Sequence, residues 1–369
     1  MKQLFLTLSL FVLLVLLFSC ADGVLTTVGS ISSAPPMTTS TPAATTSTSA
    51  VTIITTLTTS TAEETTQEIT YAEIVYDTAP TTGENGTPYI ANWNPYLLSP
   101  LVPKEYEAAF HQAIKAILNH RRTVVFDSLE ELSAVADNLF YEFPPSALCT
   151  WQKNAETLTL TFTYTDSREA HLEKLAAFRT ALEAILEETL FFGDSEAEKA
   201  ILLYHAISYT VDYFQVDYTH AQTNAFYALT EKKAICYSFA DAYNYLLRQV
   251  GMTAYLIKGC RSSDLAPHGW SLVEIDGAYY HCDPTWESSM CDGAGLYYFG
   301  LSDTKRGKTM MLSSAEMGVG ILGTHDLPKA ESDRFLAING DKFRFPDWTL
   351  ERGKDLILYR GKKYDFSSQ

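Results

Sequence analysis

The first regular pattern of apolar and polar residues begins near Pro103. Apolar residues recur at helical spacing over 110–117, and the preceding proline suits the first turn of a helix. The segment Leu158–Tyr164 alternates strictly between apolar and polar residues, which indicates a half-buried strand. This part also contains a short strand over 123–126 and a second helix over 127–140. A long helix over 166–186 follows, with a capping box at Asp166.

The second pattern, from about residue 194 onward, contains two helices and a hairpin. The stretch Cys236–Val250 has helical periodicity and precedes Gly251, a residue type that often ends helices in a left-handed conformation. Two strand-like runs, Trp270–Ile275 and Ala278–His281, flank Asp276-Gly277, which is typical of a two-residue hairpin turn. A helix after Asp194, a strand over 254–257 and a C-terminal hairpin from 343–348 and 355–359 complete the prediction.

The predicted hairpin places several polar side chains on one face. If Asp276-Gly277 forms the loop, Trp270 faces Asp283 across the hairpin, with His268 two residues further along. Because side chains alternate along a strand, His268, Trp270 and Asp283 share one face, and His268 and Asp283 are diagonal neighbours. His281 falls on the same face, and it is therefore the rival to His268 as a general base.

Cys236 has the surroundings of an activated nucleophile. It begins a predicted helix just after Lys232 and Lys233, and both the helix N-terminus and the lysines favour a thiolate. For this residue taken alone, an inert cysteine in a core helix is the alternative. An imidazole oriented by a carboxylate, as predicted for His268 and Asp283, is the base that a thiol nucleophile requires. The three residues together predict nucleophilic catalysis.

Three short motifs match a known family in order and spacing. They are Ala234-Ile235-Cys236-Tyr237-Ser238-Phe239-Ala240, His268-Gly269-Trp270 and Asp283-Pro284-Thr285-Trp286. They resemble the motifs of the transglutaminase-like superfamily over about residues 190–305. The resemblance implies an α+β, papain-like fold, in which a helix bearing Cys236 packs on an antiparallel sheet. It further implies that Cys236 is the nucleophile, His268 the base and Asp283 the orienting carboxylate.

The sequence departs from the family pattern at two places near the expected triad. Many relatives have glycine where this chain has Ser238, and His-Ala-Trp-Asn is common where it has a glycine and a serine around Trp270. Neither change removes a member of the expected triad.

The backbone N–H of Cys236 is one candidate donor to an oxyanion, and Gln222 and Asn224 are candidates for the second.

The remaining cysteines predict no cofactor. The chain has six cysteines, which do not make a disulfide scaffold at this length. Cys260, Cys282 and Cys291 with His281 lack a Cys-x-x-Cys pair, so we expect no metal site. A disulfide between Cys282 and Cys291 is the favoured alternative in an exported protein.

The N-terminus predicts export and lipid attachment. An almost unbroken apolar run, Leu4–Phe18, is too short to span a membrane and ends at Ser19-Cys20. This sequence resembles a bacterial lipobox with Cys20 as the lipidated residue, and an ordinary signal peptide is the alternative. Residues 21–100, rich in Thr and Ser as far as Thr70, are expected to form a disordered stalk. We therefore expect the protein on the outer face of the bacterial membrane, held there by lipid alone.

The net charge limits the possible partners, and the sequence pattern sets the expected domain bounds. The net charge of −17 and the pI near 4.9 argue against nucleic acid as a partner, since an acidic surface repels phosphate. After the signal peptide (1–20) and the stalk, we expect a small α/β domain over 101–190. A transglutaminase-like domain over 191–335 and a C-terminal β extension over 336–369 follow it.

Two functions of different classes are consistent with these residues. The first is a cysteine enzyme that transfers an acyl group from a peptide, protein or cell-wall polymer, either to water or to an amine. The second is a cell-surface or cell-wall binding module that keeps the fold without turnover. The sequence does not distinguish water from an amine as acceptor, because both reactions share the first step.

Overall fold

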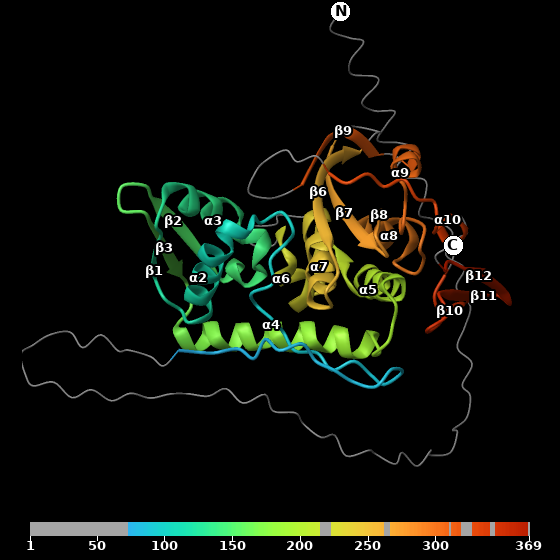
Figure 1. Ribbon diagram of the computed structural model, residues 1–369, viewed down its shortest axis with the longest axis horizontal. Helices are drawn as coiled ribbons and strands as arrows, with labels where there is room; N and C mark the ends of the chain where they lie inside the picture. Colours follow the sequence, from blue (N-terminus) through green and yellow to red (C-terminus); the bar gives the residue numbers. More distant parts are fainter. Residues whose placement is uncertain are drawn as a thin grey trace, which may run out of the picture. The chain divides into compact units, whose positions relative to one another are not determined.

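The computed structural model contains one four-stranded and two three-stranded antiparallel sheets and a two-stranded parallel sheet, with helices around them, which is the expected α+β class (Figure 1). It describes residues 73–214, 223–261, 266–309, 311–318, 327–339 and 344–367. All of them belong to one unit of the chain, Ser49–Gln369. Cys20, Gln222 and the first part of the expected stalk lie outside the described residues. Among those described, no helix is both long and apolar enough to cross a membrane.

The last part of the expected stalk, residues 73–100, packs against the folded protein, which corrects that prediction. Trp93 is buried, and its indole N–H donates to the Tyr245 hydroxyl at 2.9 Å. The backbone N–H groups of Ala91 and Trp93 donate to Glu187 and Glu183. A segment rich in turn residues is thus held by one large aromatic anchor and by side chains of a neighbouring helix.

The small α/β region has the elements that its apolar pattern predicts. Ser128 caps the second of its helices by accepting from the Glu131 N–H. The alternating segment is the central strand of the three-stranded sheet, with the order β1-β3-β2. The elements are η1 (Lys104–Tyr106), α2 (Glu107–Leu118), β1 (Thr123–Val125), α3 (Leu129–Glu142), η2 (Pro144–Leu148), β2 (Cys149–Asn154) and β3 (Thr159–Tyr164).

Two helices, α4 (Arg168–Thr189) and α5 (Glu196–Thr210), lead into the second region. The cap of α4 is Ser167, which accepts from the Ala170 N–H, and not the expected Asp166. The Asp166 carboxylate instead pairs with Lys174 at 2.6 Å. The start of α5 has a complete capping box, since Ser195 and Glu198 each accept the other's backbone N–H.

The second region centres on helix α7 and the sheet of order β8-β7-β6-β9 (Figure 1). Helix α7 ends before Gly251, whose φ of +81° confirms the predicted left-handed cap. The elements are β4 (Asp212–Tyr213), α6 (Ala225–Thr230), β5 (Lys233–Ala234), α7 (Cys236–Gln249), β6 (Ala254–Arg261), β7 (Pro267–Ile275), β8 (Ala278–Cys282), α8 (Pro284–Cys291), α9 (Asp303–Thr309) and β9 (Met311–Gly318).

The β7–β8 hairpin has the predicted register and turn. Ile275 pairs with Ala278, and φ is +50° at Asp276 and +79° at Gly277, as a type I′ turn requires. The paired strand ends at Cys282, however, so Asp283 lies just outside the ladder and begins a helix that the sequence pattern did not predict.

One hydrophobic core is shared by the two regions. Phe178 of α4 stacks on Phe226 of α6 at 5.3 Å and lies 6.0 Å from Tyr245 of α7. A buried ion pair also joins the regions, because the Arg248 guanidinium of α7 lies 3.0 Å from the Glu142 carboxylate of α3. The position of α7 therefore depends on the small α/β region.

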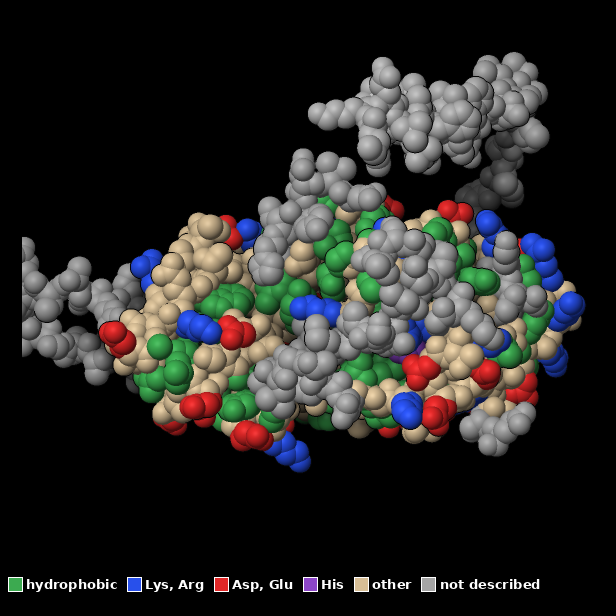
Figure 2. All heavy atoms as spheres, turned by 90° about the horizontal axis from the view of Figure 1, so that it is seen from above, with side chains coloured by type: hydrophobic (Ala, Val, Ile, Leu, Met, Phe, Trp, Pro, Cys, Tyr) green, Lys and Arg blue, Asp and Glu red, His purple; other side chains and the backbone are tan. Residues whose placement is uncertain are grey.

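The C-terminal part forms a three-stranded sheet in place of the expected hairpin. The expected first strand, 343–348, is a turn over its described residues, and pairing begins only at Trp348. A turn at Arg360-Gly361 joins the second and third strands. Lys and Arg side chains gather at the right of the view in Figure 2, the side on which the C-terminal strands lie in Figure 1. The elements are α10 (Leu336–Asn339), β10 (Trp348–Glu351), β11 (Leu356–Tyr359) and β12 (Lys362–Asp365).

Candidate active site

A histidine and a carboxylate predicted to be neighbours on the hairpin are in direct contact. His268 Nε2 lies 2.7 Å from Asp283 Oδ2, and both side chains are buried. The other oxygen of Asp283 accepts the backbone N–H of Trp286 at 3.1 Å, which makes Asp283 the N-cap of α8. The helix therefore fixes the carboxylate, and the carboxylate fixes the imidazole.

Cys236 is the second neighbour of the same imidazole. Its side chain is hydrogen-bonded to the His268 side chain, which raises the pKa of His268. The Thr285 hydroxyl donates to the Cys236 carbonyl at 3.5 Å and so joins the starts of α7 and α8. Cys236 is partly exposed, whereas His268 is buried. The base is therefore shielded from water.

The body of α7 and the imidazole lie against opposite faces of the sheet. The Ser271 hydroxyl donates to the Ala240 carbonyl of α7, whereas Trp270 belongs to the apolar cluster on the other face. His268 is two residues before Trp270 in β7, so the two side chains lie on the same face of the sheet. Cys236 reaches it because the thiol is on the first turn of α7 and His268 is near the first residue of β7.

Two indole rings flank the imidazole. The ring of Trp286 stacks on His268 with centroids 5.1 Å apart, and that of Trp270 lies 6.0 Å away with nearly parallel planes. Burial favours the neutral imidazole, but the Asp283 carboxylate and the hydrogen bond with Cys236 outweigh burial and raise the pKa of His268. Aromatic faces also stabilise a nearby cation. The resting site therefore favours a protonated His268.

His281, the rival base, has a different environment. The Trp270 indole N–H donates to His281 Nδ1 at 2.9 Å, so this nitrogen carries no proton. Nε2 then carries the proton and donates to Asp303 Oδ1, also at 2.9 Å. Burial lowers the pKa of His281 to about 4, and the bonds to Trp270 and Asp303 occupy both ring nitrogens. The structure thus places His268, and not His281, beside Cys236.

The side chain of Asn224 is not available as an oxyanion donor. Its amide donates to the Phe140 and Pro144 carbonyls, and its oxygen accepts the Phe226 N–H as the cap of α6. Gln222, the other candidate, lies outside the described residues and stays a prediction. The Cys236 N–H belongs to the first turn of α7, where N–H groups lack partners within the helix.

Both departures from the family pattern have local explanations. The Ser238 hydroxyl accepts the Ile235 N–H at 2.8 Å and donates to the Ile235 carbonyl, so it stabilises the chain just before Cys236. At Gly269, a Cβ atom would lie 2.6 Å from the Tyr237 ring. The tyrosine next to the nucleophile therefore requires glycine next to the base.

A residue that sequence reasoning missed is Tyr141 of α3. It packs against Ala240 and Leu256, as Tyr237 does, and its hydroxyl is hydrogen-bonded to Thr223. Burial raises the pKa of Tyr141 to about 12, and nearby Asp241 contributes in the same direction. No local pattern could identify this residue, because it belongs to the other region of the chain.

The other cysteines form no further reactive cluster. Cys282 and Cys291 are both free thiols, which corrects the expected disulfide. Cys282 is buried against Tyr243 of α7, whereas Cys291 ends α8 beside Glu287. The described residues contain no group of three or more His, Cys, Asp or Glu side chains that could hold a metal ion.

Comparison with known families agrees with this geometry. Residues 185–284 match the model of the transglutaminase-like superfamily, and Cys236, His268 and Asp283 all fall within the match. No curated protein sequence matches the chain.

Two solved structures are similar to part of this chain. One is a TGase, 15% identical over 37% of this chain and 43% of that chain, with a TM-score of 0.27. Another is a candidate cysteine protease from Cytophaga hutchinsonii, 19% identical over 30% of this chain and 37% of that chain, with a TM-score of 0.25. The similarity thus spans less than half the length of either structure.

Proposed function

We propose that the protein is a cysteine acyl-transfer enzyme that forms an acyl-enzyme on Cys236. The observation that carries the proposal is the arrangement around His268, whose side chain is hydrogen-bonded to the partly exposed Cys236 and to a carboxylate that is fixed at the start of α8. A thiol, an imidazole and a carboxylate in this order form the nucleophile, base and orienting group of acyl transfer.

In the first step, the Cys236 sulfur attacks the carbonyl carbon of an amide while the thiol proton resides on His268. The carbonyl oxygen becomes an oxyanion, which the Cys236 backbone N–H stabilises. Collapse of this intermediate breaks the C–N bond, and the imidazolium gives its proton to the departing amine. The products are a thioester on Cys236 and a neutral His268, which Asp283 holds in place.

In the second step, the acceptor attacks the thioester carbon. Neutral His268 takes the proton of a water molecule or of an amine, and the C–S bond breaks to release the acyl product. The thiolate then returns to its starting state with a protonated His268. Peptidase or amidase activity follows when water is the acceptor, and cross-linking follows when an amine is the acceptor.

The decisive experiment is alkylation of the purified full-length protein with iodoacetamide at pH 6, quantified at each cysteine by mass spectrometry. An ordinary thiol with a pKa near 8.5 is less than about 1% ionised at this pH. We expect Cys236 to react faster than Cys260 and Cys291, which are also outside any disulfide and partly exposed. His268→Ala should abolish this excess. Equal rates at the three cysteines would contradict the proposed enzyme and favour a binding module.

We also propose that the enzyme acts on peptides, proteins or cell-wall polymers from the outer face of a bacterial membrane. The support is the apolar run that ends at Cys20, together with the Thr- and Ser-rich segment that follows. Cys20→Ala should stop incorporation of labelled palmitate in cells. Equal labelling of the variant and the unaltered protein would exclude lipid attachment at Cys20.

A further inference from the structure

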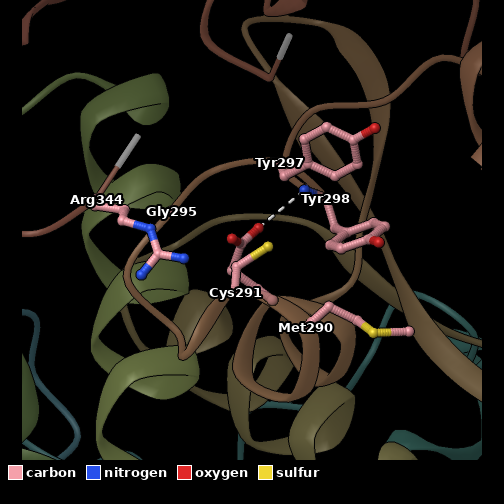
Figure 3. Close-up of a pocket in the computed structure, with 7 residues that line it drawn as sticks. Met290, Cys291, Gly295, Tyr297, Tyr298 and Arg344 are labelled. Atoms are coloured by element: carbon pink, nitrogen blue, oxygen red, sulfur yellow. Dashed lines mark hydrogen bonds between the residues drawn. The ribbon is translucent and has the colours of Figure 1, made fainter. Parts of the chain in front are cut away.

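A pocket of about 280 Å³ lies beside the C-terminal half of α8. Ligand pockets for whole drug-sized molecules have volumes of about 300–1,000 Å³, so this one suits a single side chain. Figure 3 shows the side chains of Met290, Cys291, Tyr297, Tyr298 and Arg344 around it. Glu287 and Gly295 complete the lining.

The carboxylate of Glu287 is buried beside this pocket with only one of its oxygens well satisfied. Oε2 accepts the Tyr298 N–H at 2.9 Å, the bond dashed in Figure 3, and the Tyr204 hydroxyl at 3.1 Å. Oε1 receives no N–H or O–H donor from the described residues, and the neighbouring polar group is the Cys291 thiol, a weak donor. Burial raises the pKa of Glu287 to about 7. A cation in the adjoining pocket would stabilise the charged form of this carboxylate.

The walls of the pocket are suited to an organic cation. The rings of Tyr297 and Tyr298 lie 4.9 Å apart in an edge-to-face arrangement, and aromatic faces attract ammonium groups. Met290 and Cys291 add polarizable sulfur atoms. The one cationic side chain in the lining, Arg344, is largely exposed and lies 3.7 Å from Asp292. Among the described residues, no Lys or Arg forms an ion pair with Glu287.

The pocket is separated from the triad by one aromatic side chain. Trp286 stacks on His268 on one side and meets Tyr298 edge-to-face at 5.3 Å on the other. Asp283 and Glu287 belong to the same first turn of α8, since the Glu287 N–H donates to the Asp283 carbonyl. The pocket therefore lies next to the triad, with Trp286 between the two.

We propose that this pocket is a specificity subsite for a substrate side chain that ends in a primary ammonium group, such as that of lysine. The inference rests on the proposed acyl transfer and names the chemistry of a group that flanks the reacting amide. The ammonium group lies in the pocket against the Tyr297 and Tyr298 rings and neutralises Glu287. The strongly negative net charge of the protein favours the approach of a cationic substrate.

The test measures binding without turnover, on the full-length Cys236→Ala protein. The probes are Nα-acetyl-lysine methylamide and its neutral counterpart, Nα-acetyl-norleucine methylamide, titrated by calorimetry or NMR. We expect the lysine probe to bind about tenfold more tightly than the norleucine probe. Adding Glu287→Gln should remove this preference, whereas Glu130→Gln, an equal charge change at an exposed position of α3, should leave it intact. Equal binding of the two probes overturns the proposal.

A pH series keeps the proposal falsifiable if Glu287→Gln does not fold. Because the pKa of Glu287 is raised to about 7, the carboxyl is neutral at pH 5.5 and charged at pH 8. Affinity for the lysine probe should therefore rise over this range, while affinity for the norleucine probe stays constant. A flat profile for both probes overturns the subsite. This result is independent of iodoacetamide reactivity, which tests the acyl-transfer proposal alone.

Discussion

At the scale of single residues, Asp283 performs two tasks with two oxygens. Oδ1 caps α8 through the Trp286 N–H, and Oδ2 holds His268. The first task is structural, and aspartate and asparagine perform it about equally well. The second requires a negative charge, because the carboxylate balances the imidazolium. The two tasks are therefore separable by choice of substitution.

We predict that Asp283→Asn keeps the free energy of unfolding nearly unchanged but lowers acyl transfer by about 10³-fold or more. Asp283→Ala should lose activity too, and it should lower the free energy of unfolding by about 1 kcal/mol because the cap is gone. Since Asp283 raises the pKa of His268, the alkaline limb of kcat/KM should move to lower pH in the asparagine variant. Chemical denaturation and pH–rate profiles measure these effects. An active Asn variant would remove Asp283 from the proposed triad.

At the scale of elements, the β7–β8 hairpin presents two histidines with different tasks. His268 is near the end next to α7 and α8, whereas His281 joins Trp270 of β7 to Asp303 of α9. The backbone of His281 also exchanges two hydrogen bonds with Leu301. One hairpin therefore supports both the base and the packing of the chain segment that follows.

We predict that His281→Gln retains acyl transfer, whereas His268→Ala abolishes it. Burial holds the pKa of His281 at about 4 in the folded protein, against an ordinary value of 6.5. The unfolded chain therefore takes up a proton first as the pH falls, and stability is lost between about pH 6.5 and pH 4. His281→Gln should make this loss shallower by up to about 1.4 kcal/mol per pH unit. Denaturation at pH 7 and pH 5 measures it, and identical slopes would contradict the neutral buried state.

At the scale of the whole molecule, the small α/β region holds the helix that carries the nucleophile. The buried Glu142 carboxylate of α3 meets Arg248 of α7 and also accepts two hydrogen bonds from Ser99. Trp93 adds the hydrogen bond to Tyr245 on the same helix. The transglutaminase-like region therefore shares its core with the residues that precede it.

We predict that Glu142→Gln lowers the free energy of unfolding by about 3 kcal/mol, because it leaves the Arg248 charge buried without its partner. The matched control is Asp137→Asn, which removes an exposed pair with Lys153 and should cost less than about 1 kcal/mol. Urea denaturation of both variants provides the measurement. Equal and small losses would show that the pair does not fasten α3 to α7.

The local sequence determined the elements on which the candidate site is built. The helix from Cys236 and its end at Gly251 follow from apolar periodicity and from a residue that tolerates positive φ. The Asp276-Gly277 turn sets the register of the hairpin and so brings His268 close to Asp283. These features depend on residues close together in the chain, where turn geometry and side-chain alternation decide the outcome.

Tertiary structure alone decided how these elements meet. Asp283 lies beyond the end of the strand and caps α8. Cys236 contacts His268 from the first turn of α7, a helix whose body packs on the other face of the sheet. The burial of Trp93, the approach of Tyr141 and the pocket beside Glu287 have no local signal. The physical reason is that packing between distant segments depends on the shapes of all the surfaces that meet, whereas periodicity reports only which face of each element is apolar.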